Sequence, residues 1–67
     1  MTDFVKNKVQ KLRKRKNVTQ LELADSVGVT RQTIIAIEKG NYTPSVLLAI
    51  KIAEYFGVKV EQVFAIQ

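Results

Sequence analysis

The segment from Thr19 to Gly40, TQLELADSVGVTRQTIIAIEKG, constrains the fold more than any other part of the chain. It opens with a capping box: the Thr19 hydroxyl can accept a hydrogen bond from the Glu22 N–H, and the Glu22 carboxylate can accept one from the Thr19 N–H. The helix that starts there is expected to stop before Gly28, because glycine adopts a left-handed backbone at little cost. A first short helix running to about Val27 is therefore predicted.

A second short helix is predicted directly after this turn, over residues 31–39. Thr30 can cap its N-terminus with the side-chain hydroxyl, and Ile34 and Ile37 lie three residues apart on one inward face. Two short helices joined by a tight turn that contains glycine form a helix-turn-helix unit. The segment as a whole predicts that unit over residues 19–40.

The outer face of this second helix carries side chains suited to the edges of DNA bases. Arginine can form bidentate hydrogen bonds with the O6/N7 pair of guanine, glutamine can do so with the N6/N7 pair of adenine, and aliphatic groups pack on thymine methyls. The predicted base contacts are Arg31, Gln32, Thr33, Ile35 and Ala36. The alternative is that Arg31 and Gln32 are ordinary surface residues and that Ile35 contacts a second copy.

The pattern resembles the helix-turn-helix of the Cro/phage-repressor (Xre-type) family. The matching positions are Gln20, Leu23, Ala24, Val27, Gly28, Val29, Thr30, Thr33, Ile34, Ile37, Glu38 and Gly40, together with Arg13, Pro44, Ile52, Ala53, Phe56, Gly57 and Val58 outside the unit. The resemblance implies an all-α fold, a compact five-helix domain spanning residues 1–67. It also implies a DNA-binding transcriptional regulator that places the recognition helix, residues 31–39, in the major groove.

The resemblance further implies roles for residues around the recognition helix. The expected phosphate contacts are Gln20, Thr30, Lys39, Asn41, Tyr42 and Thr43. Arg13 and Glu38 are expected to form a partly buried ion pair that fixes the first helix onto the unit. The alternatives are that Gln20 is only a polar residue at a helix start, that Asn41 serves the turn, and that the ion pair is two separate surface charges.

The positive charge is concentrated at the start of the chain. Residues 1–16 hold seven Lys or Arg and one Asp, a net charge of +6, while residues 17–67 hold four Lys or Arg and five acids, a net charge of −1. A helix from Asp3 to about Lys16 is predicted, with Val5, Val9 and Leu12 as its apolar stripe. The excess points to a polyanion, and DNA phosphates are expected to meet these cations. The alternatives are a solvated helix face or an amphipathic helix on a membrane surface.

Several classes of function are disfavoured by what the sequence lacks. The chain has neither cysteine nor histidine, so thiolate metal sites, disulfides and an imidazole base are unavailable. A Gly-rich phosphate-binding loop is also missing. The sequence shows no apolar run long enough to cross a bilayer and no signal peptide. We therefore expect a cytoplasmic protein that is not an enzyme and uses neither a metal nor another cofactor.

The second half of the chain predicts a strongly apolar helix. Thr43 and Pro44 are expected to start it, as N-cap and first helical residue, and a helix that is apolar on every side is buried on every side. The expected inward residues are Val46, Ala49, Ile52, Ala53 and Phe56. The apolar surplus predicts a homodimer interface within residues 44–67, formed by Leu47, Leu48, Ile50, Phe64 and Ile66.

A fifth helix is predicted from Glu61 to about Ala65. Its start is poorly capped, because Lys59 stands where the resembling family has Ser or Thr. Val58 and Val60 could instead belong to a short strand.

Together these features predict a sequence-specific DNA-binding regulator, a repressor or controller, acting as a homodimer on a palindromic operator. A phage repressor, a restriction–modification controller and an antitoxin are all compatible, with a further protein as a regulatory partner. The alternative is a protein-interaction adapter that uses the same fold without binding double-stranded DNA.

Overall fold

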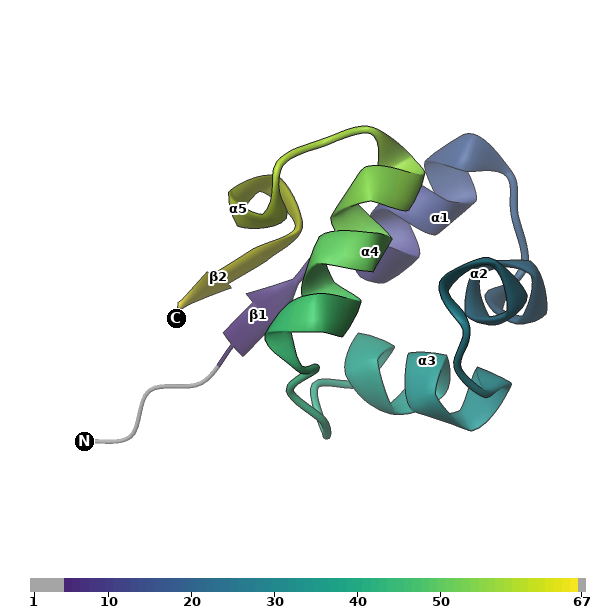
Figure 1. The fold of residues 1–67 in the computed structure, drawn as a ribbon, viewed down its shortest axis with the longest axis horizontal. Coiled ribbons are helices and arrows are strands. Elements are labelled where there is room, and N and C mark those ends of the chain that lie inside the picture. Colours follow the sequence, from purple (N-terminus) through teal and green to yellow (C-terminus); the bar gives the residue numbers. More distant parts are fainter. Residues whose placement is uncertain (1–4, 67) are drawn as a thin grey trace.

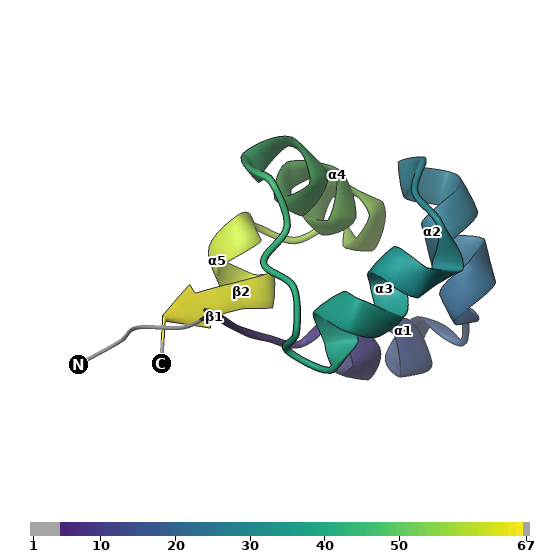
Figure 2. The same ribbon diagram turned by 90° about the horizontal axis from the view of Figure 1, so that it is seen from below.

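The computed structural model describes residues 5–66 as five helices and a two-stranded antiparallel sheet. In chain order the elements are β1 (Val5–Asn7), α1 (Val9–Lys16), α2 (Gln20–Val27), α3 (Arg31–Glu38), α4 (Val46–Phe56), α5 (Val60–Val63) and β2 (Phe64–Ile66). Figure 1 shows α3 along the lower edge, with α1, α2 and α4 above it and the sheet on the side away from α2. Seen from below, α3 lies nearest the viewer (Figure 2).

The predicted helix-turn-helix is confirmed. The Thr19 Oγ1 accepts from the Glu22 N–H at 3.0 Å, and the Glu22 Oε1 accepts from the Thr19 N–H at 2.8 Å. Gly28 adopts a left-handed backbone with φ of 78° and ends α2. The two helices pack their apolar faces into a core shared with α1, α4 and α5. The buried apolar residues are Val9, Leu23, Ala24, Val27, Ile34, Ile37, Leu48, Ile52, Ala53 and Val63.

The fold is not purely all-α, which corrects the sequence prediction. β1 pairs with β2 antiparallel, with Val5 opposite Ile66 and Asn7 opposite Phe64. The predicted helix from Asp3 to Lys16 is therefore too long: α1 begins at Val9, and Asp3 lies outside the described residues. The spacing of Val5, Val9 and Leu12 fitted one continuous helix. Val5 instead lies in a strand, because it pairs with Ile66 at the other end of the chain.

Asn7, which the sequence pattern did not single out, holds the first N–H of α1, although the N-cap residue itself is Lys8. Its Oδ1 accepts a hydrogen bond from the Val9 N–H at 3.1 Å, and its Nδ2 donates to the Ile37 carbonyl in α3 at 2.8 Å. The next residue ties the same corner to α5, since the Lys8 N–H donates to the Val63 carbonyl at 2.9 Å. One side chain therefore joins β1, α1 and the end of α3. An asparagine side chain can bind the backbone N–H two residues on, so this local contact was open to prediction.

Replacing Asn7 by alanine is expected to lower the free energy of unfolding by about 1–2 kcal/mol, because both the bond to the Val9 N–H and the bond to the Ile37 carbonyl are lost. Asn7→Asp keeps the acceptor for the Val9 N–H but cannot donate to Ile37. Urea unfolding of both variants separates the two contributions. If Asn7→Ala unfolds at the urea concentration of the unmodified protein, the bridging role is wrong.

The start of α4 also differs from the prediction. The N-cap is Ser45, whose Oγ accepts from the Leu48 N–H at 3.1 Å, so Thr43 and Pro44 precede the helix. Leu48 faces the core at 6% exposure, whereas Val46 points outward at 77%. Because α4 is apolar nearly all round, periodicity alone could not distinguish these two faces.

The last part of the chain is a short helix followed by a strand. α5 ends at Val63, so Phe64 and Ala65 belong to β2 and not to the predicted helix. As expected, the Lys59 side chain does not cap α5. The Gln62 Oε1 instead accepts from the Lys59 N–H at 2.8 Å.

Candidate nucleic-acid interface

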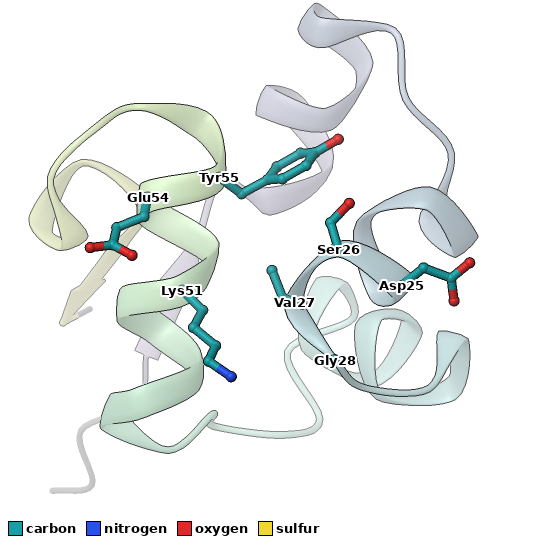
Figure 3. A pocket seen from close by; sticks show the side chains of 7 residues that line it. All are labelled: Asp25, Ser26, Val27, Gly28, Lys51, Glu54 and Tyr55. Carbon is teal, nitrogen blue, oxygen red and sulfur yellow. The ribbon is translucent and has the colours of Figure 1, made fainter.

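An open hollow lies between the C-terminal end of α2 and α4. It is lined by Asp25, Ser26, Val27, Gly28, Lys51, Glu54 and Tyr55, and Figure 3 shows Lys51 and Tyr55 extending from α4 toward α2. Its two carboxylates and one lysine lie beside a tyrosine and a serine, without a histidine or cysteine to act as general base or thiolate. This composition favours an ordinary solvated surface over a catalytic site.

The first turn of α3 presents polar side chains to solvent. Thr30 caps the helix, since its Oγ1 accepts from the Thr33 N–H at 3.3 Å and lies 3.2 Å from the Thr33 Oγ1. Arg31 and Gln32 follow and are both exposed. Within residues 5–66, neither of these two side chains forms a hydrogen bond to the protein. Their donors and acceptors are therefore available to a ligand lying along α3.

The remaining predicted base-contact residues lie at the border of this face. Thr33, Ile35 and Ala36 are each half-buried, while Ile34 and Ile37 fill the core as expected. The outer face of α3 thus begins with two free polar groups and continues into small or aliphatic groups. Such a surface can form hydrogen bonds at one end and apolar contacts along its length.

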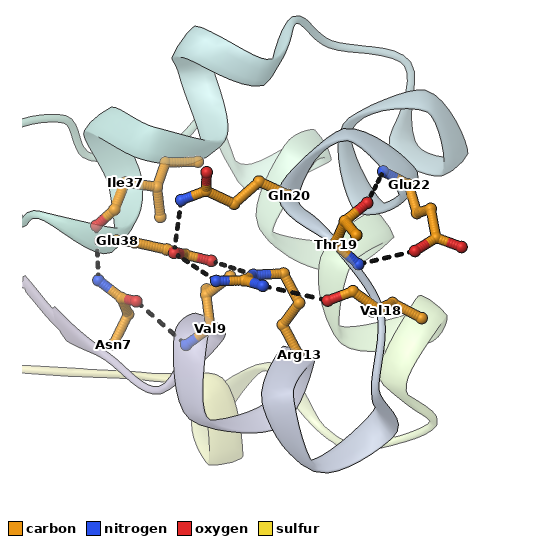
Figure 4. Close-up of polar contacts among 9 residues, drawn as sticks. All are labelled: Asn7, Val9, Arg13, Val18, Thr19, Gln20, Glu22, Ile37 and Glu38. Carbon is orange, nitrogen blue, oxygen red and sulfur yellow. Dashed lines mark hydrogen bonds and ion pairs between the residues drawn. The ribbon is translucent and has the colours of Figure 1, made fainter.

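An ion pair fixes α3 against α1 (Figure 4). The Arg13 Nε donates to the Glu38 Oε2 at 2.8 Å and the Nη2 donates to the Oε1 at 3.2 Å, a bidentate arrangement. The third nitrogen, Nη1, donates to the Val18 carbonyl at 3.1 Å. Both side chains are buried, at 11% and 4% exposure. The orientation of α3 is therefore fixed by the guanidinium of Arg13, a residue of α1.

Protonation of Arg13 is secured by the same contacts. Its hydrogen bond to Glu38 raises the pKa of the guanidinium above its ordinary value, and the negative charge of Glu38 acts in the same direction, against the opposing effect of burial. A raised pKa in the folded state means that this contribution to stability is complete below the ordinary pKa and is lost only as pH rises through the raised one. Arg13 is therefore protonated at neutral pH and carries the charge that the ion pair requires.

Gln20 takes part in the same cluster. Its Nε2 donates to the Glu38 Oε1 at 3.1 Å, which connects the start of α2 to the end of α3. An amide nitrogen has two N–H groups, so one remains for the phosphate contact expected of this residue. The geometry gives Gln20 an additional structural role that the sequence pattern did not indicate.

The loop after α3 contains the other expected phosphate contacts. Lys39, Asn41, Tyr42 and Thr43 are all exposed. The loop is held to the helix because the Asn41 N–H donates to the Ala36 carbonyl at 2.9 Å, with Gly40 at φ of 80°. Figure 1 shows this segment at the lower edge of the molecule beside α3. The loop thus extends the exposed surface of the recognition helix.

The cations of α1 are divided between two flanks of the helix. Lys14 borders a hollow with Asn17, Thr19 and Gln20, on the side that approaches the helix-turn-helix. Lys8, Lys11 and Arg15 instead border a hollow with α5. Lys14 therefore lies on the flank nearer the helix-turn-helix, and the other three cations lie on the flank nearer α5. The expectation that the cations of α1 meet DNA phosphates stays a prediction.

The predicted dimer residues also fall into two groups. Leu47, Ile50 and Ile66 are exposed, as an interface requires. Leu48 belongs to the core of its own chain, which corrects its assignment, and Phe64 is half-buried against that core. Val46, expected to point inward, adds to the exposed apolar surface. If Ser45 had been taken as the N-cap of this helix, the exposure of Val46 would have been predicted, because residues in the first turn lie at the edge of the core.

Two further observations on the described residues concern clusters of metal ligands and membrane-spanning helices. Within residues 5–66 the structure contains no group of three or more carboxylates or other ligands that could hold a metal ion. None of the helices in the same part of the chain has the length and apolar character needed to cross a membrane.

Comparison with known proteins gives a consistent assignment. The helix-turn-helix family profile matches residues 9–63. The HTH-type transcriptional regulator MJ0272 from Methanocaldococcus jannaschii is 58% identical over 60 residues, covering 90% of this chain and 91% of the relative. The HTH-type transcriptional regulator YgzD from Bacillus subtilis is 57% identical over 60 residues, with coverage of 90% and 91%. The restriction-modification controller protein C.AhdI from Aeromonas hydrophila has the same fold, with a TM-score of 0.77 at 24% identity over 82% of this chain and 83% of that chain.

Proposed function

The chain belongs to the Cro/phage-repressor (Xre-type) family of helix-turn-helix transcriptional regulators, and we propose that it binds a palindromic operator as a homodimer. As a family member it is a DNA-binding regulator and not an enzyme. In the proposed complex, α3 of each copy lies in a major groove, and the two recognition helices are about 34 Å apart.

The observation that carries this proposal is the free polar start of α3. Arg31 and Gln32 are exposed and unpaired in the described part of the chain, on a helix whose orientation is fixed by the buried Arg13–Glu38 pair. A helix held rigidly in this way does not have to order itself on binding, which lowers the entropic cost of association. We assign Arg31 and Gln32 the hydrogen-bonded base contacts. Thr33, Ile35 and Ala36 line the apolar border that meets thymine methyls.

Phosphate contacts are proposed on both sides of this helix. Thr30 is the N-cap of α3, and Gln20 lies at the start of α2, where it binds Glu38. The loop that follows the end of α3 contributes Lys39, Asn41, Tyr42 and Thr43. Lys14 joins them from α1. Such contacts position the protein without reading sequence, and the release of counterions makes affinity fall as salt rises.

The homodimer is supported by the exposed apolar surface of Val46, Leu47, Ile50 and Ile66. Four large apolar side chains exposed on one small protein favour burial against a partner. A two-fold axis through this surface would present two α3 helices to two half-sites, which explains why the operator is expected to be palindromic.

Selection of bound duplexes from a random library tests the proposal directly. We expect enrichment of an inverted repeat whose half-site centres are separated by about one helical turn. Enrichment of a single unpaired half-site would contradict the homodimer, and absence of any enriched sequence would contradict sequence-specific binding.

Arg31→Ala is expected to cost about 1–3 kcal/mol of binding free energy on the selected operator and to relax the preference at one base pair. Lys39→Ala is expected instead to weaken binding to cognate and random duplexes alike, because it removes a phosphate contact. Titration of both variants against both duplexes at fixed salt checks the division. If the two variants lose the same affinity on both duplexes, the assignment of roles is wrong.

A further inference from the structure

A groove between α1 and α5 lies outside the proposed DNA surface. We call it the α1–α5 groove: a hollow of about 380 Å³ lined by Lys8, Lys11, Leu12, Arg15, Val58, Glu61 and Gln62. Leu12 and Val58 are half-buried and form its apolar floor, while the cations stand at its rim on α1. None of these residues has a role in the proposed binding of DNA.

The three cations share one flank of α1. Lys8 is the N-cap residue directly before α1, and Lys11 and Arg15 follow within the helix at intervals of three and four residues, a spacing that places side chains on the same face. All three are exposed. In the described residues the only ion pair within 4.0 Å is Arg13–Glu38. Within the described part of the chain, these three cations therefore form no ion pair, and Glu61 is the one carboxylate among the residues that line the groove.

This flank faces away from the recognition helix. Arg13 points from α1 toward α3, where it meets Glu38, whereas Lys8, Lys11 and Arg15 border residues of the α4–α5 region. In Figure 1, α5 and the end of α1 lie in the upper part of the molecule and α3 lies along its lower edge. A straight duplex held by α3 and its following loop would not reach the groove.

We propose that the α1–α5 groove binds an acidic peptide segment of a partner protein while α3 remains on DNA. Lys8 and Arg15 are seven residues apart, about 10 Å along a helix, which an extended peptide covers with roughly three residues. Carboxylates of such a segment meet the cations, and an apolar side chain between them covers Leu12 and Val58. The groove thus gives the regulator a second binding surface that does not compete with the operator.

Two features favour an acidic peptide over a second DNA duplex. Glu61 is exposed at the rim of the groove and would repel a phosphate backbone, whereas a mixed peptide can place a polar or basic residue beside it. The apolar floor offers nothing to a sugar-phosphate chain, but it can bury an aliphatic side chain. The chemistry of the groove therefore matches carboxylates combined with aliphatic groups.

The test uses a short synthetic peptide of Glu, Asp and Leu, with a fluorescent label, and the same peptide with Gln and Asn in place of the acids. Binding is followed by fluorescence anisotropy at low salt, with full-length protein and in the presence of saturating operator DNA. The variant Lys11→Gln/Arg15→Gln removes two groove cations. Its matched control, Lys16→Gln/Lys51→Gln, removes the same charge from exposed positions elsewhere on α1 and on α4, neither of which lines the groove or has a proposed contact with DNA.

We expect the acidic peptide to bind the operator complex and its amide counterpart not to bind. The groove variant should weaken peptide binding about fivefold or more, through the loss of two charge pairs, while the control stays within about twofold. In an NMR titration the peptide should shift amide signals in α1 and α5 and leave those of α3 unchanged.

Three results would overturn the proposal. They are failure of the acidic peptide to bind, displacement of the peptide by operator DNA, and equal weakening by the groove variant and its control. A fourth result, measured on operator DNA, would also overturn it. If the groove variant lowers the slope of log operator affinity against log salt concentration by about two, the groove contacts phosphates and not a peptide. Because operator binding is measured separately, these outcomes are distinguishable from a failure of the proposed function.

Discussion

Replacing Arg13 by methionine is expected to destabilise the protein by about 3–5 kcal/mol, because it leaves a buried carboxylate without its cation. Glu38 is only 4% exposed, and after the substitution its remaining side-chain partner is the Gln20 amide. The Val18 carbonyl also loses its donor. A chain of 67 residues has a total stability of about 3–10 kcal/mol, so a loss of this size can unfold a large fraction of the molecules.

The double variant Arg13→Met/Glu38→Leu is the control. Removing both charges leaves apolar side chains of similar volume, which often restores stability. Urea unfolding should therefore place the double variant well above Arg13→Met, and if Arg13→Met does not fold at all, folding of the double variant supports the same conclusion. If both variants have the same stability, the cost comes from lost packing of the arginine side chain and not from an orphaned charge.

The central unit was predictable because its signals are local. The capping box of Thr19 and Glu22, the left-handed Gly28 and the Thr30 cap each act over three or four residues, so the sequence shows them directly. The Arg13–Glu38 pair is different, since its two members are 25 residues apart. It followed from the family resemblance, and charge spacing alone left it open.

The sheet could not be predicted from the same local signals. β1 and β2 have three residues each and join opposite ends of the chain. Such short segments have no clear alternation of apolar and polar residues, and Val5 fitted the helical spacing of Val9 and Leu12. Pairing across the chain, together with the bond between the Asn7 side chain and the Val9 N–H, decides the structure of this segment.

Helix α4 illustrates a second limit. An apolar residue at nearly every position gives no periodic signal, so the orientation depends on where the helix begins. With Ser45 as the cap, Leu48 and Ile52 face inward and Val46 faces solvent. As predicted, α4 carries more apolar surface than the core of one chain can cover. The exposed residues are Val46, Leu47 and Ile50, with Val46 in place of Leu48.

Ile50→Lys is expected to convert the proposed dimer into a monomer and to lower operator affinity by about a hundredfold or more. Ile50 is 42% exposed and lies one turn from Val46 on α4, so a lysine there places an unpaired charge in the apolar contact. A dimer binds its second half-site as an intramolecular step, and this advantage reaches about 10²–10⁴ without any new contact. Sedimentation and operator titration measure the two consequences separately.

Leu21→Lys provides the matched control, because Leu21 is an exposed aliphatic residue on α2, outside the apolar surface of α4 and β2. It should sediment like the unmodified protein, and the helical content of both variants should be unchanged, since neither side chain fills the core. Affinity for a single half-site should also survive in Ile50→Lys, because α3 and its supporting ion pair are intact. If the unmodified protein already sediments as a monomer at high concentration, the exposed residues of α4 do not form a dimer, and the palindromic operator loses its structural basis.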